Sequence, residues 1–345
     1  MELRLLKCSC HNMQSVNSAF VTRSGLQACD SLNRDRAWAI VRLVSDEVRE
    51  AAESECGPSD DNGTPLYEPV TIRNFTKMVL IQPSFGHDGE LILNLPDSRS
   101  MRVPLISRGN ANLRCFLWHS MCYGRDQGDD VSLFLTEFLK SKTPLRLVHM
   151  GEDQLRPLNI DTKYGSLVKD TDVVSRFSDW STYTLLSEQS VSWVNNKLPA
   201  GTPSSDAQTF RSNIVVDAPF PFWEDSLLEC RVLGSDGTSP WKFRFAKHCG
   251  RCTLPTVNRH TGKRSRTLEP LRTLKKYRTN YYPHITDPNS PFHTPQAFLS
   301  INITIDLNDN DLPIIKVGDV LKPTQTQTPP VMMVGRNNPW GSKYY

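Results

Sequence analysis

Two cysteines at Cys-x-x-Cys spacing, Cys249 and Cys252, are the residues of this sequence best suited to soft-metal or redox chemistry. A loop rich in Thr, Pro, Asn and Gly follows them, and a basic run with helix-compatible residues, 271–278, closes the segment. A thiolate is a soft metal ligand, and cationic and hydroxyl side chains bind anions. The segment 245–278 therefore suits a large anionic cofactor that carries a soft metal.

Four interpretations of this cysteine pair remain open on its spacing alone. A thioredoxin-like redox pair should open a helix inside a βαβ unit, whereas Pro255, Asn258 and Gly262 soon follow and predict a loop. A finger-like zinc site needs two further ligands, and the chain has no second Cys-x-x-Cys pair. The other interpretations are two buried structural cysteines, or one cysteine that ligates a metal carried by an organic cofactor.

Length and composition limit the class of protein. A chain of 345 residues can form one large or two ordinary domains, and its net charge is only +3. This balance argues against a nucleic-acid-binding protein, in which Lys and Arg gather in excess. Nine scattered cysteines are typical of a reducing compartment rather than of a disulfide framework. No apolar run approaches the roughly 18 residues of a transmembrane helix, so none is predicted.

Short apolar runs bounded by Gly, Pro, Asp and Ser predict a β-rich first half. We expect strands at residues 3–6, 78–82, 90–95, 101–105, 112–121 and 145–150. The acidic segment 47–63 is expected to be a loop, and 129–140 an amphipathic helix. A strand should also begin at Ala37, directly after Arg36.

The second half is expected to start near residue 158. Ser187 can cap a helix that ends near residue 198, and β-branched residues after Arg211 predict a strand. A strand-turn-strand is expected at 314–321, followed by a flexible Pro- and Thr-rich tail. The predicted domains are therefore 1–157, 158–322 and a tail at 323–345.

The stretch RCTLPTVNRHTGKRSRTLEPLRTLKKYR, residues 251–278, resembles the signature of MOSC-domain proteins, in particular the mitochondrial amidoxime-reducing components. In that family Arg-Cys precedes a Thr-Thr-Val-Asp-Pro-x-Thr-Gly-like run and then Glu-Pro-Leu-x-Thr-Leu-x-x-Tyr-Arg. The resemblance implies that Cys252, rather than Cys249, is the protein ligand of molybdenum. Pro255 and the Asn258-Arg259 pair depart from the family pattern without removing this ligand.

Two further arginine segments carry the same resemblance. Residues 34–38 resemble the family's Asp-Arg-x-Trp segment, and residues 210–216 resemble Phe-Arg-Pro-Asn-Ile-Val-Val. Arginine binds oxyanions through two parallel hydrogen bonds, so the resemblance implies that Arg36 and Arg211 contact the cofactor. Asn213 either holds the turn or bonds the cofactor.

The remaining site residues also rest on resemblance. Asp179, Trp180 and Ser181 fall where the family contacts the pterin with backbone and hydroxyl groups. Ser9 matches the serine of the family's Lys-Ser-Cys turn, although a cysteine replaces the lysine before it. Asp225 lies in a Glu-Asp-Ser run, where it would orient an arginine, assist protons, or form a structural ion pair.

The resemblance implies a mixed, β-rich α+β fold, with a β-barrel-like MOSC N-terminal unit followed by a MOSC β-barrel unit. The expected function is reduction of N-hydroxylated compounds such as amidoximes and hydroxylamines to amines by molybdenum cofactor (Mo-molybdopterin). Cytochrome b5 and NADH-cytochrome b5 reductase would donate the electrons. A carrier or sulfur-transfer MOSC module and an inactive binding protein are the alternatives.

The resemblance also bears on location and on a second cofactor. It implies the cytosol-facing mitochondrial outer membrane, or the cytosol if the family's N-terminal anchor is genuinely missing from this chain. At the level of the family, it also allows pyridoxal phosphate binding. Neither expectation follows from composition or spacing.

Overall fold

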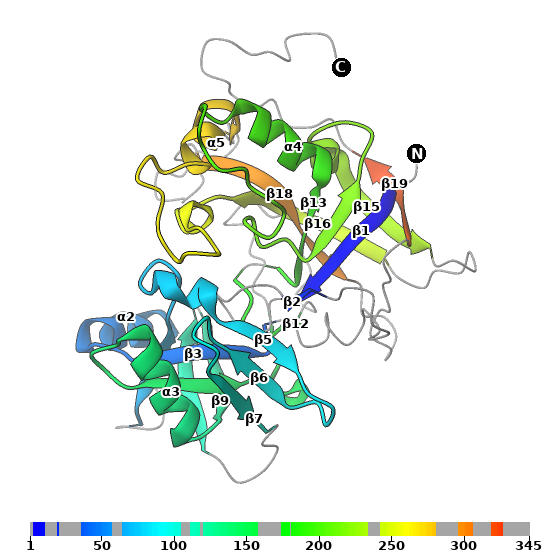
Figure 1. Cartoon of the computed structure of the whole chain (residues 1–345). Coiled ribbons are helices and arrows are strands. Elements are labelled where there is room, and N and C mark those ends of the chain that lie inside the picture. Colours follow the sequence, from blue (N-terminus) through cyan, green and yellow to red (C-terminus); the bar gives the residue numbers. More distant parts are fainter. Residues whose placement is uncertain are drawn as a thin grey trace.

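The computed structural model divides the chain into two β-rich units with few helices (Figure 1). The residues it describes are 3–10, 19–20, 36–56, 64–104, 111–117, 120–157, 174–179, 181–233, 242–280, 296–305 and 319–326. Only the backbone is described for residues 3–10 and 19–20.

The first unit is built on a closed barrel of five strands. Their order around the ring is β10 (Leu145–His149), β3 (Trp38–Leu43), β4 (Leu66–Pro69), β8 (Asn112–Leu117) and β9 (Ser120–Asp126). Side chains alternate between the two faces of a strand, so Trp38 and Ile40 enter one apolar cluster while Ala39 and Val41 enter another. Both faces of β3 are therefore buried.

A helix and a small sheet pack against the barrel. The helix is α3 (Asp129–Leu139), and the sheet consists of β5 (Gln82–Phe85), β6 (Leu91–Asn94) and β7 (Ser100–Val103). Val131, Leu135 and Phe138 of α3 join the same cluster as Trp38. The amphipathic helix predicted for residues 129–140 is confirmed. A two-stranded sheet, β11 (Arg156–Pro157) with β12 (Val174–Ser175), follows the unit.

Two sequence-based predictions for this unit are wrong. The acidic segment 47–63, expected to be a loop, begins with α2 (Asp46–Cys56), because its first-turn acids favour a helix N-terminus and its alanines and glutamates are strong helix formers. The segment 78–82, expected to be a strand, lies mainly in the 3₁₀ helix η1 (Thr76–Leu80). A run this short does not show whether its apolar side chains recur with the spacing of a strand or of a helix. Either element can bury Met78 and Val79.

The second unit is a nine-stranded sheet that curls back on itself. Its hydrogen-bonded order is β13 (Tyr183–Ser187), β14 (Ile214–Asp217), β1 (Leu3–Cys10), β19 (Val320–Thr326), β15 (Leu227–Leu233), β16 (Lys242–Gly250), β18 (Gln296–Ile305) and β17 (Thr279–Asn280). The short β2 (Ala19–Phe20) pairs with β1. Because β13 also pairs with β18, the seven strands from β13 to β18 in this order form a closed ring, and β17 lies outside it. The predicted β-rich fold class is confirmed.

The strand β1 comes from the start of the chain but belongs to the second sheet. Arg4 pairs with Asp217 of β14, and Leu3 pairs with Leu321 of β19. The second sheet therefore contains residues from both sides of the boundary predicted at 157. Residues 323–326, predicted as part of a tail, continue β19, and the rest of that predicted tail lies outside the described residues.

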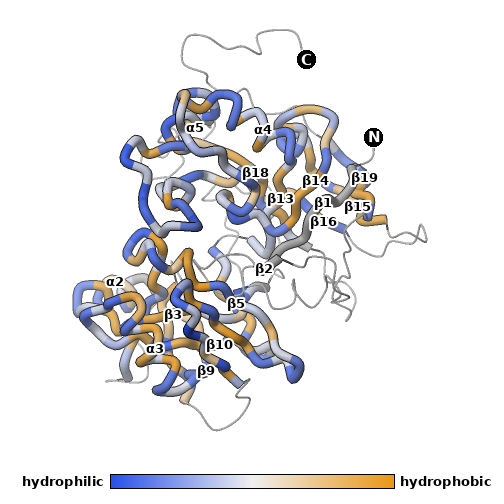
Figure 2. Tube along the Cα trace, viewed as in Figure 1, coloured by the Kyte–Doolittle hydropathy of each residue, from blue (hydrophilic) through white to orange (hydrophobic). Residues whose placement is uncertain are grey.

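Two helices, α4 (Glu188–Lys197) and α5 (Leu271–Tyr277), pack over one face of the second sheet (Figure 1). Val194 and Leu274 share an apolar cluster with Leu299 of β18. The Ser187 hydroxyl accepts a 3.2 Å hydrogen bond from the Ser190 N–H, so the predicted cap of α4 is confirmed. Figure 2 shows hydrophobic residues concentrated along the strands of both units and hydrophilic residues along the loops.

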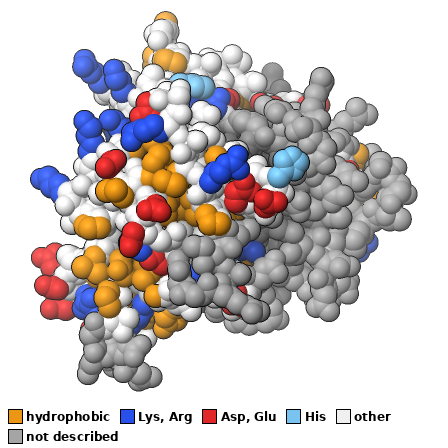
Figure 3. Space-filling view, turned by 60° about the horizontal axis from the view of Figure 1, so that its bottom comes forward, with side chains coloured by type: hydrophobic (Ala, Val, Ile, Leu, Met, Phe, Trp, Pro, Cys, Tyr) orange, Lys and Arg blue, Asp and Glu red, His pale blue; other side chains and the backbone are white. Residues whose placement is uncertain are grey.

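The outer surface carries charges of both signs. On the face shown in Figure 3, Lys and Arg side chains project along one edge, and Asp and Glu side chains lie among apolar ones. This mixture agrees with the net charge of +3. In the part of the chain that the structure describes, no helix has the length and apolar composition needed to cross a bilayer.

Candidate functional site

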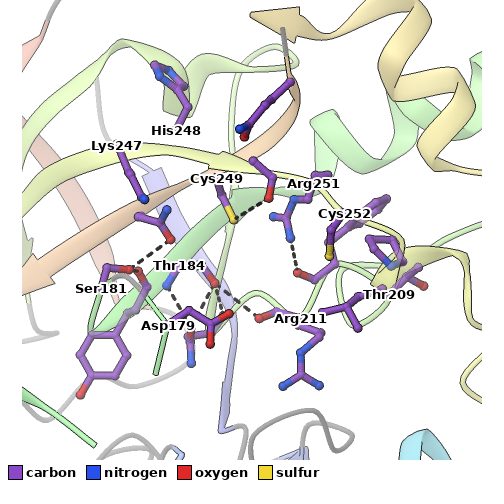
Figure 4. Close-up of a pocket in the computed structure, with 18 of the residues that line it drawn as sticks. Asp179, Ser181, Thr184, Thr209, Arg211, Lys247, His248, Cys249, Arg251 and Cys252 are labelled. Atoms are coloured by element: carbon purple, nitrogen blue, oxygen red, sulfur yellow. Dashed lines mark hydrogen bonds between the residues drawn. The ribbon is translucent and has the colours of Figure 1, made fainter. Parts of the chain in front are cut away.

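A cavity of about 240 Å³ lies among β13, β16, β18 and the turn before β14 in the second unit (Figure 4). Arg36 and Arg73 of the first unit also line it, so both units form its walls. The sequence-predicted residues that line this cavity are Arg36, Asp179, Ser181, Arg211, Asn213 and Cys252. The structure therefore brings together residues spread over more than half of the chain.

Cys249 and Cys252 both line the cavity but differ in exposure. Cys252 follows the end of β16 and precedes the 3₁₀ helix η5 (Leu254–Thr256), and its side chain is exposed. Cys249 lies within β16, is half-buried, and has its Sγ 4.0 Å from the Gly250 carbonyl oxygen. Both thiols are free. The Cys252 thiol is thus the more accessible to a group bound in the cavity.

Arg251, between the two cysteines, is a structural residue. Its Nε and Nη2 donate hydrogen bonds of 2.8 and 2.6 Å to the Leu299 carbonyl oxygen, and its Nη1 donates one of 2.8 Å to the Phe210 carbonyl oxygen. Its guanidinium also lies 5.7 Å from the centre of the Phe210 ring. One side chain therefore ties the residue before Cys252 to β18 and to the turn before β14.

The loop after Cys252 is held by the first unit. Leu254 and Val257 pack in the apolar cluster of that unit. Arg264 Nη2 donates a 3.2 Å hydrogen bond to the Arg73 carbonyl oxygen. The thiol of Cys252 is consequently fixed from both sides, by β16 before it and by the first unit after it.

Arg36 and Arg211 share an unusual backbone conformation. Their φ angles are +53° and +57°, in the left-handed region that non-glycine residues seldom adopt. Such strain persists where the surrounding structure enforces it, and it concentrates at ligand sites. Both side chains line the cavity, and their role as anion contacts stays a prediction.

The polar residues of the cavity floor form an ordered network. The single Ser181 hydroxyl proton is shared between the Tyr183 carbonyl oxygen at 2.9 Å and Asn302 Oδ1 at 3.1 Å. Asn213 Oδ1 accepts from the Thr184 N–H at 2.9 Å and from its hydroxyl at 3.0 Å. The oxygen of Asn213 thus holds the turn, which was one of its two predicted roles.

Two predicted contacts cannot be placed in this network. Trp180 lies outside the described residues. Ser9 lies in β1, of which only the backbone is described. Their roles stay predictions.

Asp225 lies beside the cavity rather than on its wall. Its buried carboxylate accepts a 2.6 Å hydrogen bond from Arg278 Nη2, and His248 Nε2 lies 3.7 Å away. Burial lowers the pKa of His248, against the opposing effect of Asp225. Asp225 thus forms a structural ion pair with Arg278, which is one of the three roles that the sequence analysis left open for it.

The sequence analysis missed Lys247, which lines the cavity although it is only 8% exposed. Burial lowers the pKa of Lys247 to about 7, although the neighbouring Cys249 and Asp179 act in the opposite direction. Local sequence gave no signal for its burial, because the alternation of buried residues at Phe243 and Phe245 breaks where the register of β16 against β18 shifts between Phe245 and Lys247.

A second cavity, of about 460 Å³, adjoins the first and shares Thr209 and Pro255 with it. An ion pair of 2.7 Å between Arg259 and Asp206 joins two of its walls. Among the described residues, no group of three or more His, Cys, Asp and Glu side chains could hold a bare metal ion. The first cavity instead offers two free thiols, those of Cys249 and Cys252, together with arginine and lysine side chains, hydroxyls and the carboxylate of Asp179.

Two family profiles match the sequence: the MOSC N-terminal beta barrel domain over residues 7–142 and the MOSC domain over residues 172–321. Together they cover most of the chain, which therefore belongs to the MOSC-domain proteins. The closed barrel and the curled sheet described above are the corresponding units.

Curated relatives add names from two groups. The chain is 36% identical over 210 residues to "Mitochondrial amidoxime-reducing component 1" of Xenopus laevis, covering 61% of this chain and 57% of the relative. It is 33% identical over 219 residues to the protein of the same name from Danio rerio, covering 64% and 61%. "Molybdenum cofactor sulfurase 2" of Culex quinquefasciatus is 25% identical over 230 residues, which are 63% of this chain and 27% of that protein. The match thus spans less than two-thirds of each of these relatives.

Proposed function

We propose that this protein is a molybdenum-cofactor-dependent oxidoreductase that reduces N-hydroxylated compounds to amines. The observation that carries the proposal is the exposed Cys252 thiol on a cavity whose walls also hold Arg36, Arg211 and Lys247. A soft ligand and fixed cations are the two requirements of a metal carried by an anionic organic group.

The cavity fits such a cofactor by its chemistry. The guanidiniums of Arg36 and Arg211 suit a phosphate, since their planar forks match its oxygens. Asp179 and the Ser181 hydroxyl suit the polar edge of a pterin. The thiol of Cys252, exposed at the end of β16, suits the metal. When bound, the cofactor would supply two-electron redox chemistry at molybdenum.

The chain's own residues would bind and orient. The Cys252 side chain would ligate the metal as a thiolate, which is the form of cysteine that binds metals. Arg251 would keep the thiol and the Arg211 turn in a constant relationship through its three backbone hydrogen bonds. Neither the nucleotide-binding glycine fingerprint nor a flavin motif is present in the sequence, which supports a separate electron donor.

The partners and the location belong to the same proposal. Cytochrome b5 with its NADH-dependent reductase would supply electrons, and small N-hydroxylated compounds would be the substrates. A mitochondrial location is supported by the names of the Xenopus laevis and Danio rerio relatives, which place those proteins at mitochondria. The cytosol-facing outer membrane is the finer part of this proposal and rests on the family resemblance alone. Pyridoxal phosphate binding stays a family-level prediction.

A carrier or sulfur-transfer module is the second candidate. The match to the Culex quinquefasciatus sulfurase favours it, because a segment covering only 27% of that protein resembles this chain. In this case the cavity would hold the cofactor without N-reduction.

Two measurements on protein purified from a cofactor-competent host test these candidates. Molybdenum and pterin near one equivalent per chain, together with reduction of a benzamidoxime by reconstituted donors, would support the oxidoreductase. Full cofactor without reduction would favour the carrier. Absence of both molybdenum and pterin would refute both functions.

A further inference from the structure

Lys247 is a charged side chain in the wall of the cavity and is almost fully buried. Removing an ammonium from water costs free energy that acceptor groups must offset. Asp179 and Cys249 are the nearby groups that favour its charge, but burial outweighs them. Asp179 is also attracted to Arg156, so it is shared between two cations.

The sheet places Lys247 in a row of polar residues. Lys247 of β16 pairs with Asn302 of β18, and Asn302 pairs with Thr184 of β13. Thr184 in turn is bonded to Asn213, at the start of β14. The register of β16 against β18 shifts between Phe245 and Lys247, and such irregularities re-aim side chains. All four members of the row line the cavity.

The Asn302 amide adds a second donor to this row. Its Oδ1 accepts the Ser181 hydroxyl at 3.1 Å, so its Nδ2 is turned the other way. Figure 4 shows Lys247 and Cys252 at opposite ends of the cavity, with Cys249 between them, and His248 directed away. Lys247 therefore serves the part of a ligand that lies far from the thiol.

We propose that Lys247 is a ligand-positioning residue, which with Asn302 donates hydrogen bonds to the carbonyl edge of a bound aminopyrimidinone ring while Asp179 accepts from its amino edge. This ring is the one that a pterin carries, so the inference rests on the proposed function. It adds to that function the hydrogen-bond donors, Lys247 and Asn302, and the acceptor, Asp179, that would recognise the pterin end of the cofactor.

A pH dependence follows from this placement. The charged and titratable residues that line the cavity with Lys247 are Arg36, Arg73, Asp179, Tyr183, Arg211, His248, Cys249, Arg251 and Cys252. Of these, Cys249 and Asp179 favour the charged form of Lys247. Since the pKa of Lys247 is about 7, the side chain is mostly an ammonium at lower pH and mostly a neutral amine at higher pH. Ligand retention by the ammonium should therefore be stronger on the acidic side of neutrality.

The first test measures retention of pterin and molybdenum by the full chain during dialysis at about pH 6 and about pH 8.5, on either side of that pKa. Lys247→Met should lose pterin about tenfold faster than wild type near pH 6 and show no difference between the two pH values. Lys247→Arg should retain the cofactor at both. Lys242→Met is the control, because Lys242 lies on the same strand but pairs with Glu229 at 2.6 Å outside the cavity.

The second test uses cofactor-free protein and does not depend on the metal. Acetylation of Lys247 by acetic anhydride is followed by mass spectrometry with and without 6-carboxypterin or 6-carboxylumazine, which has an oxygen in place of the amino group. We expect protection by the pterin and much less by the lumazine. Thermal unfolding of each variant checks that it folds.

The outcomes separate the inference from the proposed function. If wild-type protein never contains pterin but 6-carboxypterin protects Lys247, the proposed function fails and the inference stands. If wild type contains cofactor but Lys247→Met retains it as well as wild type does at both pH values, the inference is overturned. Equal protection by pterin and lumazine would also overturn it.

Discussion

Arg251 Nη1 donates a 2.8 Å hydrogen bond to the carbonyl oxygen of Phe210, so the residue before Cys252 holds the turn that carries Arg211. The same guanidinium reaches across to Leu299 of β18. The Arg251 side chain thus fixes the positions of Cys252 and Arg211 relative to each other.

Replacing Arg251 with lysine should destabilise the protein by about 1.5–3 kcal/mol, because an ammonium cannot reproduce the planar fork that makes three hydrogen bonds to two backbone carbonyl oxygens. Urea unfolding measures this loss. Cofactor retention should fall as well, since the turn before Arg211 loses its support. Arg272→Lys is the control, because Arg272 is an exposed residue of α5.

A double-mutant cycle with Arg211→Ala sharpens this test. Coupled residues give non-additive effects, so the double variant should lose less cofactor affinity than the two single variants together. Additive losses would show that Arg251 does not act through the turn.

The two cysteines should respond differently to serine. Cys252→Ser should abolish N-reduction and change the metal's spectroscopic signature, because a hydroxyl is a harder and more basic ligand than a thiol. Cys249→Ser should keep substantial activity, since its half-buried thiol is not the predicted ligand. Activity and bound molybdenum are measured side by side. Equal loss in both variants would discard the single-ligand assignment and favour a redox pair.

Gly262 should tolerate alanine less well than Gly201 does. Both glycines have positive φ angles, +65° and +78°, so alanine is strained at either position. A Cβ at Gly262 would also lie 3.1 Å from Leu80 Cδ1 of the first unit, whereas nothing lies within 4 Å at Gly201. The extra loss of unfolding free energy in Gly262→Ala measures how tightly the loop after Cys252 packs on that unit. Equal losses would argue against this packing.

Glu224 should make stability decrease with rising pH. Its carboxyl is fully buried, and burial, aided by Asp225, raises its pKa above the ordinary 4.5, although Ser190 and Ser187 donate hydrogen bonds to it. Between 4.5 and the folded pKa, the folded state binds more protons than the unfolded state, so its stability falls as pH rises through this window.

Glu224→Gln should remove this fall while keeping an oxygen acceptor for Ser190. The difference in unfolding free energy between variant and wild type should therefore shift in favour of the variant as pH rises from about 4 to about 8. Urea unfolding over this range provides the measurement. Parallel curves for the two proteins would contradict the assignment.

Local patterns predicted much of this structure. The Ser187 cap, the apolar face of α3 and the strand after Arg211 each depend on neighbours within a few residues, and each is present. The segment 47–63 shows the limit of composition, because acidic residues and alanines are compatible with loop and helix alike.

Local sequence patterns predicted less of the candidate site. The resemblance placed Arg36, Arg211 and Cys252 on one cavity, but nothing in it pointed to Lys247. The burial of Lys247 depends on the register shifts of β16 against β18, which are long-range pairings that local sequence does not encode. The left-handed conformations of the two arginines likewise depend on tertiary contacts.

The pairing of β1 also dictates an order of assembly. Leu3 of β1 pairs with Leu321 of β19, so β1 must wait until the remaining described strands of the second unit and then β19 have been synthesised. The five strands of the first barrel lie between Trp38 and His149 and can close while synthesis continues. Contacts between distant residues form slowly, because loop closure costs entropy before pairing repays it. Until β1 fills its place, β14 and β19 expose unpaired edges, which makes the nascent second unit the aggregation-prone half of the polypeptide.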